Sequence, residues 1–132
     1  MSLDKTDIGT YQDWLKRAKS NLSRSRQPKP DDVIWEDLCF DAQQSVEKAL
    51  KALLVFKDIA FRFVHDIAAL LTALEQHGID LPESIKRAAE LTEYAVTTRY
   101  PGTAEPVTAV EHQEAVQIAE TVMKWVQTQL PP

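Results

Sequence analysis

The segment AQQSVEKALKALL, residues 42–54, repeats apolar side chains at intervals of three and four positions. An α-helix turns once every 3.6 residues, so this spacing places those side chains on one face. The same pattern begins several residues earlier and predicts a long helix with one buried stripe. The apolar positions of that stripe are Trp35, Leu38, Cys39, Ala42, Val46, Ala49, Leu50 and Leu53.

A second apolar stripe precedes this helix along the chain. It predicts a first helix whose buried face carries Tyr11, Trp14, Leu15, Ala18 and Leu22. Pro28 and Pro30 indicate where the first helix has ended, because proline cannot continue a helix. Asp31 and Asp32 are preferred N-cap residues, so we expect the long helix to begin just after them.

The sequence after the long helix is harder to assign at one place. The segment KDIAFRF, residues 57–63, fits either a short link or a frayed continuation of the helix. Beyond it, a third helix is predicted from about His65, and Gly78 is its expected C-terminal cap.

Two further helices complete the prediction. Pro82 fits the first turn of a fourth helix, which runs until the sequence RYPG at residues 99–102. Thr108 and Glu111 have the spacing of a capping box, in which each side chain accepts a hydrogen bond from the backbone of the other residue. They predict the start of the last helix.

These patterns predict an all-α protein, with about five helices in an up-and-down antiparallel bundle. Glycine is scarce, the alternation typical of β-strands is absent, and 132 residues suit one domain. We therefore expect a single helical domain over residues 1–132, with its core at about residues 11–130.

The composition limits the classes of function. A net charge of −5 argues against broad, charge-driven binding of nucleic acid. The single cysteine, Cys39, is expected to be a small buried apolar residue. No apolar run reaches the ~20 residues that span a bilayer, and no signal-peptide pattern opens the chain. We expect a cytoplasmic protein without membrane contact.

The sequence lacks the common catalytic and metal-binding signatures. It contains no GxxxxGK[ST], GxGxxG or HExxH motif and no cluster of cysteine and histidine. His65, His77 and His112 lie in separate elements without the spacing of metal ligands. No metal and no cofactor is expected.

The long helix carries the first group of candidate functional residues. Glu47 and Lys51 are four residues apart on the helix and fit an ion pair worth about 0.2–0.5 kcal/mol. Alternatively, Gln44, Lys48 and Lys51 share one side and line a polar groove against another helix or a partner. The sequence leaves both interpretations open.

Further candidates lie at helix ends. His65 is expected at a helix N-terminus, where the dipole disfavours its protonated form and leaves a neutral base, or a local cap. Arg99 in a last helical turn suits the dipole, but its guanidinium also suits bidentate contact with phosphate. Tyr100 beside it could stack on a base.

The first helix and the residues after it are unusually basic. This run is either a solvated face or a strip that contacts phosphate or a partner. Its members are Lys16, Arg17, Lys19, Arg24, Arg26 and Lys29.

The segments AQQSVEKALKALL, VHDIAALL and TEYAVTTRYPG, followed by a last amphipathic helix, resemble the HEPN family in their order along residues 14–130. The resemblance implies a bundle of about five helices that is usually homodimeric. It also implies association with a minimal nucleotidyltransferase, often in a toxin–antitoxin-like pair. Some members are metal-independent ribonucleases, and others are non-catalytic modules that bind a nucleotide or a partner. Matching the motifs gives the candidate functional residues Glu47, Lys51, His65, Arg99 and Tyr100.

One departure from the family pattern bears on catalysis. The ribonuclease members carry an arginine, four to six residues and a histidine on one late helix. Here Pro101 and Gly102 follow Arg99, and His112 lies beyond that spacing. Arg62 and His65 are too close together to match.

The leading hypothesis is therefore a non-catalytic module that binds a nucleotide or a partner. In it, Arg99, with help from Lys51, contacts a phosphate or carboxylate in a groove between the second and fourth helices, with Glu47, Lys48, His65 and Tyr100 in the same site. One alternative is a metal-independent endoribonuclease that uses His65 and Arg99 on RNA. The other is a purely structural dimerisation domain.

Overall fold

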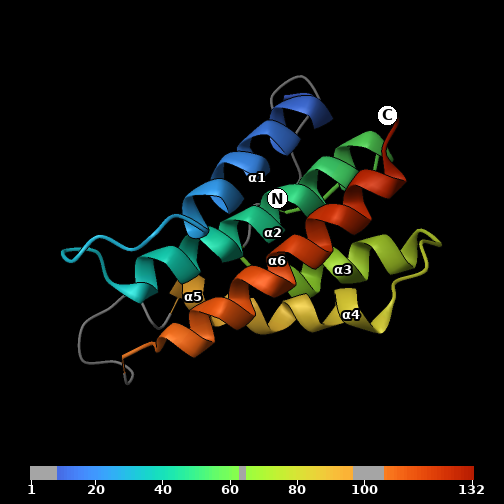
Figure 1. The fold of residues 1–132 in the computed structure, drawn as a ribbon. Coiled ribbons are helices and arrows are strands. Elements are labelled where there is room, and N and C mark those ends of the chain that lie inside the picture. The colour runs from blue at the N-terminus through green and yellow to red at the C-terminus, as the bar shows by residue number, and fades with distance from the viewer. Residues whose placement is uncertain (1–8, 63–64, 97–105) are drawn as a thin grey trace.

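The computed structural model describes residues 9–62, 65–96 and 106–132, and every regular element in these ranges is helical (Figure 1). Three segments, α4 (Glu83–Lys86), η2 (Arg87–Thr92) and α5 (Glu93–Val96), follow one another without a gap, so η2 is a 3₁₀ stretch inside one helical segment. Counted this way, the described residues form five helical segments and confirm the all-α prediction. The elements are α1 (Tyr11–Ser25), α2 (Trp35–Phe56), α3 (Ile67–Gln76), α4 (Glu83–Lys86), η2 (Arg87–Thr92), α5 (Glu93–Val96) and α6 (Ala109–Gln129).

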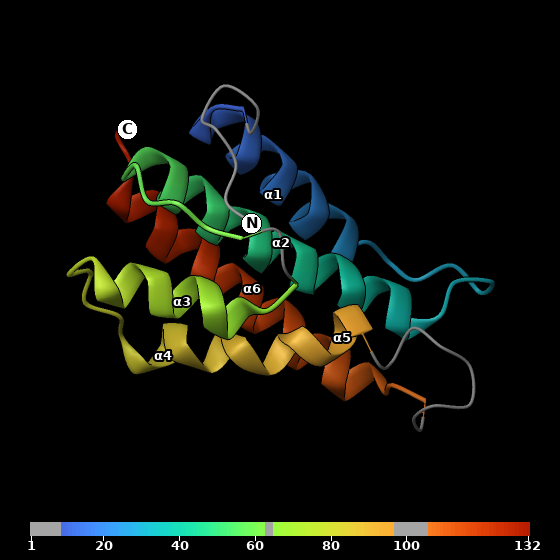
Figure 2. The same ribbon diagram turned by 180° about the vertical axis from the view of Figure 1, so that it is seen from behind.

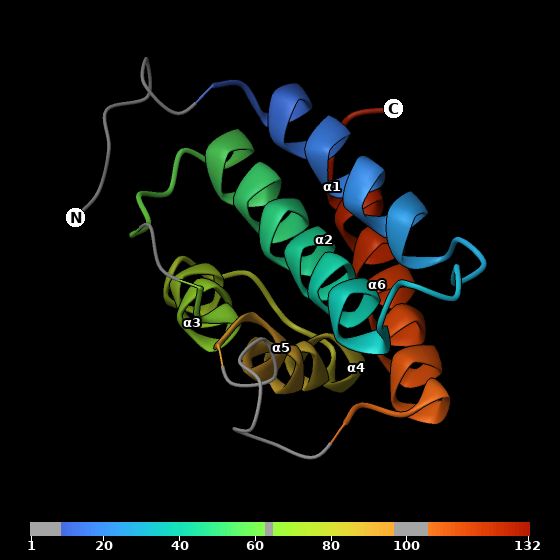
Figure 3. The ribbon, with the colours of Figure 1, turned by 90° about the vertical axis from the view of Figure 1, so that its left-hand side faces the viewer.

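The long helix α2 lies at the centre of the bundle, and the other helices pack around it (Figure 3). Helix α1 runs antiparallel to α2, and the α4–α5 segment runs antiparallel to α3 and α6 (Figures 1 and 2). After α2 ends, the chain runs back along this helix, so that α3 begins beside the middle of the bundle (Figure 2). This return brings residues 57–62 against the helix from which they emerge.

The N-terminus of α2 differs from the prediction. We expected Asp31 or Asp32 to cap this helix, but the N-cap is Ile34, which makes no side-chain capping bond. The reason is a turn closed by a hydrogen bond from the Val33 backbone N–H to the Pro30 carbonyl, 3.1 Å long. Both aspartates are the central residues of that turn, so they precede the helix by too many positions to cap it.

The other helix ends follow their sequence signals more closely. The capping box of Thr108 and Glu111 is present at the start of α6, as predicted. A second capping box, formed by Thr10 and Asp13, opens α1. After α3, Gly78 has a φ of +84°, which glycine adopts without steric cost.

Residues 57–62 form a link, which settles the ambiguity of the KDIAFRF segment for the described part of it. Lys57 is the C-cap of α2, and Asp58 has a φ of 60°, so the helix does not continue. Ile59 and Phe61 are nevertheless buried, which fixes the link against the bundle. Helix α3 begins only at Ile67.

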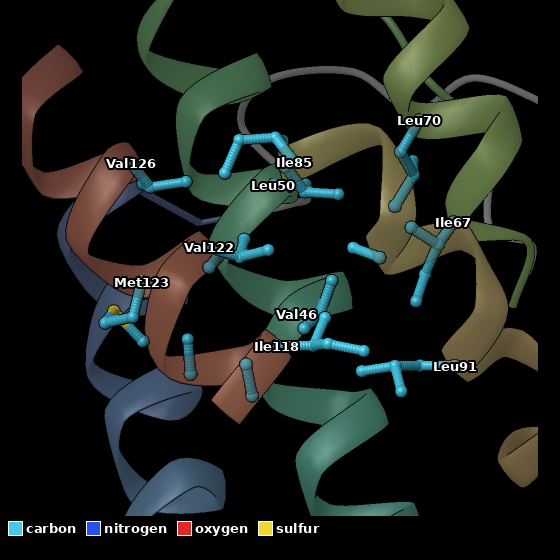
Figure 4. Packing of buried hydrophobic residues seen from close by; sticks show 14 of the residues in the cluster. Val46, Leu50, Ile67, Leu70, Ile85, Leu91, Ile118, Val122, Met123 and Val126 are labelled. Carbon is cyan, nitrogen blue, oxygen red and sulfur yellow. The ribbon is translucent and has the colours of Figure 1, made fainter. Parts of the chain in front are cut away.

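Apolar side chains from all the main helices meet in one cluster (Figure 4). Burial of such side chains is the dominant favourable contribution to folding. Cys39 is fully buried in it, as predicted, and burial raises the pKa of its thiol to about 12. The largest completely buried members are Val46, Leu50, Leu53, Leu54, Ile67, Leu70, Leu74, Ile85, Val122 and Val126. Among the described helices, none is at once long and apolar enough to cross a bilayer.

Candidate functional site

A buried ion pair lies on the side of α2 that faces α1 and the link. The Lys51 ammonium is 2.7 Å from Oε1 of Glu47, and the two side chains are 4% and 3% exposed. The predicted pair is therefore confirmed, and both of its side chains are buried. Because both charges are removed from water, the small energies of exposed helix pairs do not apply to it.

Two glutamine amides complete the surroundings of the Glu47 carboxylate. Gln43 donates from Nε2 to Oε2 of Glu47 at 2.9 Å, and Gln44 donates to the same oxygen at 3.3 Å. Gln44 also donates to Oε1 of Gln43 at 2.8 Å. These donors lie three and four residues before Glu47, so one turn of α2 provides them. Both glutamines are buried.

Two aromatic rings enclose the ammonium of Lys51. Its Nζ lies 5.5 Å from the ring centroid of Trp14 on α1 and 5.8 Å from that of Phe61 in the link. The two rings meet edge to face, with their centroids 6.3 Å apart. Both rings present electron density to the cation. A direct contact between Lys51 and an external phosphate would require these rings to move.

His65 is the exposed member of this group. Its Nδ1 lies 3.0 and 3.2 Å from the two carboxylate oxygens of Glu47, while its side chain is 64% exposed. A carboxylate only accepts hydrogen bonds, so Nδ1 carries the hydrogen and Nε2 keeps its lone pair in the neutral ring. We call Gln43, Gln44, Glu47, Lys51 and His65 the Glu47 cluster.

The position of His65 relative to α3 differs from the prediction. His65 was expected to start the helix or to cap it, but the N-cap is Asp66, whose carboxylate accepts from the Ala68 N–H at 3.1 Å. The Ile67 N–H donates to the hydroxyl of Thr92 in η2. The His65 ring is instead held by its contact with Glu47.

The surroundings of Glu47 keep it ionised. Burial raises the pKa of this carboxyl, but hydrogen bonds and charge from Lys51, with the hydrogen bonds from His65 and Gln43, outweigh burial and leave the pKa below its ordinary value. The cluster therefore holds a carboxylate and an ammonium of opposite charge at neutral pH. An exposed imidazole completes it.

Lys48 belongs to a different set of contacts. Its Nζ donates to Oδ1 of Asn21 at 2.9 Å, and Asn21 donates from Nδ2 to Asp41 at 3.2 Å. Arg24, whose Nε is 3.4 Å from Oδ2 of Asp41, completes this Asp41 network between α1 and α2. Sequence reasoning grouped Lys48 with Lys51, whereas the two ammonium groups donate to different acceptors.

Burial dominates the electrostatics of the Asp41 network. It raises the pKa of Asp41 despite the nearby Arg24 and Asn21. It also lowers the pKa of Lys48, with a further lowering from the charge of Arg17. Both shifts disfavour the charged form of the group.

A hollow of about 410 Å³ opens between the link and α3, next in sequence to His65. Volumes from about 300 Å³ upward are typical of small-molecule sites. We call it the α3 hollow. It is lined by Ala60, Phe61, Arg62, Asp66, Ala69, Leu70 and Ala73.

Comparison with known proteins identifies the family. A family model described as HEPN domain matches residues 11–129. The chain belongs to the HEPN family.

Two solved structures support the assignment of this HEPN chain. TT1696 from Thermus thermophilus superposes with a TM-score of 0.79 at 32% identity, over 91% of this chain and 98% of that one. ST0689, described as an archaeal HEPN homologue, gives a TM-score of 0.75 at 30% identity, over 92% and 98%. No match is found among curated proteins.

The structure describes only some of the predicted candidate site residues. Arg99 and Tyr100 lie outside the described residues, so their proximity to His65 stays a prediction. Glu47, Lys51 and His65 come together, and Lys48 joins Asn21 instead. Across residues 9–62, 65–96 and 106–132, no group of three metal-binding side chains is found.

Sequence reasoning missed several members of the candidate site. Gln43 was not singled out, although it stands one helical turn before Glu47. Trp14 was assigned to the apolar stripe of the first helix, and Phe61 to the ambiguous KDIAFRF segment. Only the fold brings both rings next to the Lys51 ammonium. Arg62 at the α3 hollow was considered only for a ribonuclease spacing that it does not fit.

Proposed function

We propose that this HEPN protein is a non-catalytic binding module that recognises the phosphate of a nucleotide, or an acidic group of a partner protein, through His65. The observation that carries the proposal is the contact between exposed His65 and the buried, charge-balanced pair of Glu47 and Lys51. An imidazole anchored at Nδ1 presents Nε2 to a ligand in one orientation, and the protonated ring donates a hydrogen bond from Nε2 to a phosphate or carboxylate oxygen. Such anchoring lowers the conformational entropy lost on binding.

The cluster gives Glu47 and Lys51 positioning roles in this proposal. Glu47 holds the ring of His65, and Lys51 neutralises Glu47, so the imidazole meets a ligand without the repulsion of an unbalanced carboxylate. This changes the earlier hypothesis, in which Lys51 touched the phosphate itself. Its enclosure by Trp14 and Phe61 favours the indirect role.

The α3 hollow supports a nucleotide as the ligand. Its wall combines the apolar surface of Phe61 and Leu70 with the guanidinium of Arg62. A base could pack on the apolar wall while a phosphate approaches Arg62 and His65. Arg99 and Tyr100 join this site in the proposal as further contacts to phosphate and base.

The biological setting is also part of the proposal. Membership of the HEPN family supports a homodimer that works in the cytoplasm with a minimal nucleotidyltransferase, in a toxin–antitoxin-like pair. A molar mass from light scattering at micromolar concentration tests the dimer, and a monomeric mass would contradict it.

Calorimetric titration with ATP and GTP, in EDTA and then in magnesium, tests the binding site. Wild-type protein should bind at least one nucleotide, and His65→Ala and Arg99→Ala should each weaken binding about tenfold, the effect of losing one charge-assisted hydrogen bond. His77→Ala is the matched control. His77 is also exposed and also uses Nδ1, at 2.9 Å from the Ala73 carbonyl, but it lies at the other end of α3.

Two outcomes would contradict the nucleotide proposal. One is the absence of heat with either nucleotide; the other is equal weakening in His77→Ala and His65→Ala. If His65→Ala and Arg99→Ala instead weaken only the binding of a purified minimal nucleotidyltransferase, the ligand is the partner protein and the site is retained.

The contact between His65 and Glu47 also favours a second candidate, the metal-independent endoribonuclease. A carboxylate at Nδ1 leaves Nε2 as a base, the arrangement by which histidine accepts a proton from a hydroxyl. Cleavage of a labelled structured RNA in EDTA tests this candidate. Cleavage that disappears in both His65→Ala and Arg99→Ala would replace the binding module with the ribonuclease, and intact RNA with wild-type protein excludes it for that substrate.

A further inference from the structure

A groove runs between α1 and α6, which are neighbours on the side of α2 away from α3 (Figure 3). Its main hollow has a volume of about 410 Å³. The exposed edges of two buried core residues, Leu22 and Met123, form an apolar floor, and Lys19, Arg26 and Lys124 supply positive charge. A second hollow of about 280 Å³ shares Arg26 and continues along α6 past Val116. We call both together the α1–α6 groove.

The positive charge of the groove contrasts with the chain as a whole. Residues 11–29 hold six basic side chains and one acidic one, whereas the complete chain has 15 basic and 20 acidic residues. The fold divides this basic run between two surfaces. Arg24 contacts Asp41 of the Asp41 network, while Lys19 and Arg26 line the groove.

The groove already contains one contact between an arginine and a carboxylate. Nη1 of Arg26, the C-cap of α1, lies 3.0 Å from Oε2 of Glu120 on α6. The two side chains are 48% and 38% exposed, so water and other molecules can reach this pair. Exposed pairs contribute little to stability, which leaves Arg26 able to exchange one carboxylate for another.

We propose that the α1–α6 groove binds an acidic amphipathic helix of a partner protein. The apolar face of that helix packs on Leu22 and Met123, and its carboxylates contact Lys19, Lys124 and Arg26. Glu120 occupies Arg26 in the free protein and is displaced on binding. A helix in a groove contacts it through residues three and four apart, which fits a groove bounded by two helices.

Two features favour an acidic protein over nucleic acid. The floor is apolar, and a sugar–phosphate backbone would gain little from Leu22 and Met123. Glu120 would also repel a row of phosphates, whereas a peptide can place an uncharged residue opposite it. The groove is distinct from the Glu47 cluster, so the inference does not depend on the proposed function.

Fluorescence anisotropy with a defined peptide tests the groove. The probe is a fluorescein-labelled helical peptide of about 18 residues, or five turns, with leucine at positions three and four apart and glutamate elsewhere. Lys19→Glu and Lys124→Glu should each raise Kd about fivefold at low salt. Arg17→Glu is the matched control, because Arg17 is an exposed residue of the same helix that does not line the groove.

Glu120→Gln provides the more specific test. It removes the internal carboxylate, so peptide affinity should rise about threefold. A role for Glu120 in stability alone would not raise affinity. Circular dichroism and Tm establish that each variant is folded.

Four results would overturn the inference. The first is no binding of the peptide by wild-type protein, and the second is an equal loss in Arg17→Glu and the groove variants. The third is weaker binding in Glu120→Gln. The fourth is displacement of the peptide by a single-stranded RNA at lower concentration than by unlabelled peptide, which would assign the groove to nucleic acid.

Discussion

Helix α2 carries two polar groupings that interleave in sequence but differ in how their charges are balanced. In the Glu47 cluster, a carboxylate and an ammonium of the same helix face each other under aromatic rings. In the Asp41 network, an amide separates Lys48 from Asp41, and the arginine that contacts Asp41 is 69% exposed. Water reaches the arginine of the Asp41 network and is excluded from the ion pair of the Glu47 cluster.

This difference is visible in the two carboxylates. The pKa of Glu47 is lowered because its partners outweigh burial, and the pKa of Asp41 is raised because burial outweighs its partners. A buried carboxyl group therefore stays ionised more readily where the opposite charge is equally buried and close to it. The comparison predicts that mutations in the two groupings lower the free energy of unfolding by different amounts.

The largest effect is expected for Lys51→Met. It leaves Glu47 buried without its cation, which should cost about 3–5 kcal/mol in the free energy of unfolding. Urea denaturation measures it, and Glu47→Leu combined with Lys51→Met should restore most of the loss, because no charge then remains buried. A loss below about 1 kcal/mol would show that water reaches Glu47 and that the cluster is open.

A smaller effect is expected for Asn21→Ala in the Asp41 network. It removes both hydrogen bonds that connect Lys48 to Asp41, but Arg24 stays next to the carboxylate. The expected loss is about 1–2 kcal/mol in the same denaturation experiment. A loss as large as that of Lys51→Met would mean that the two groupings are equally closed to water.

The pH dependence of stability should differ in sign between the two carboxylates. Glu47 has a lowered pKa in the folded state, so its contribution is present above its ordinary value of 4.5 and is lost as pH falls through the folded value. Asp41 has a raised pKa, so the folded state takes up a proton more readily and gains relative stability as pH falls toward its ordinary value of 3.8.

Unfolding free energies measured between about pH 6 and pH 3 test this contrast. Asp41→Asn should make the unfolding free energy fall more steeply with decreasing pH than in wild type, because it removes the stability that Asp41 gains on protonation. Glu47→Gln should make the unfolding free energy fall less steeply with decreasing pH. Equal slopes in the two variants would contradict the opposite shifts.

The smallest effect is expected at Ser45, a position of α2 that belongs to neither grouping. Its hydroxyl is completely buried, and within the described residues it has no hydrogen-bond partner. Ser45→Ala should raise the free energy of unfolding by up to about 1 kcal/mol, since it removes an unsatisfied polar group. A decrease in thermal denaturation temperature would indicate that the hydroxyl is satisfied in solution.

Helical periodicity predicted most of the fold because the information is local. The stripe from Trp35 to Leu53 marks α2, and the signals at Gly78 and Thr108 mark the end of α3 and the start of α6. The cap at Asp31 or Asp32 failed because a competing turn uses the same residues. The fourth helix was expected to be continuous, and its 3₁₀ stretch η2 has no evident signal in the sequence.

The candidate site was predictable only in part. Spacing on one helix reveals that Glu47 and Lys51 can pair, but it does not reveal burial. Burial requires Trp14 from α1 and Phe61 from the link, which are distant in sequence. The α3 hollow likewise depends on how the link returns along α2. The roles of Arg99 and Tyr100 stay predictions that rest on the family motif.

The enclosure of Glu47 with Lys51 also has a consequence for how sequences of this kind can diverge. Replacing either residue alone leaves the other charge buried and unpaired in the protein interior. A lineage that loses the pair must therefore pass through a poorly folding intermediate, or change both codons nearly together. Positions 47 and 51 should for this reason co-vary among relatives, whereas positions 26 and 120, whose pair is open to water, should drift independently.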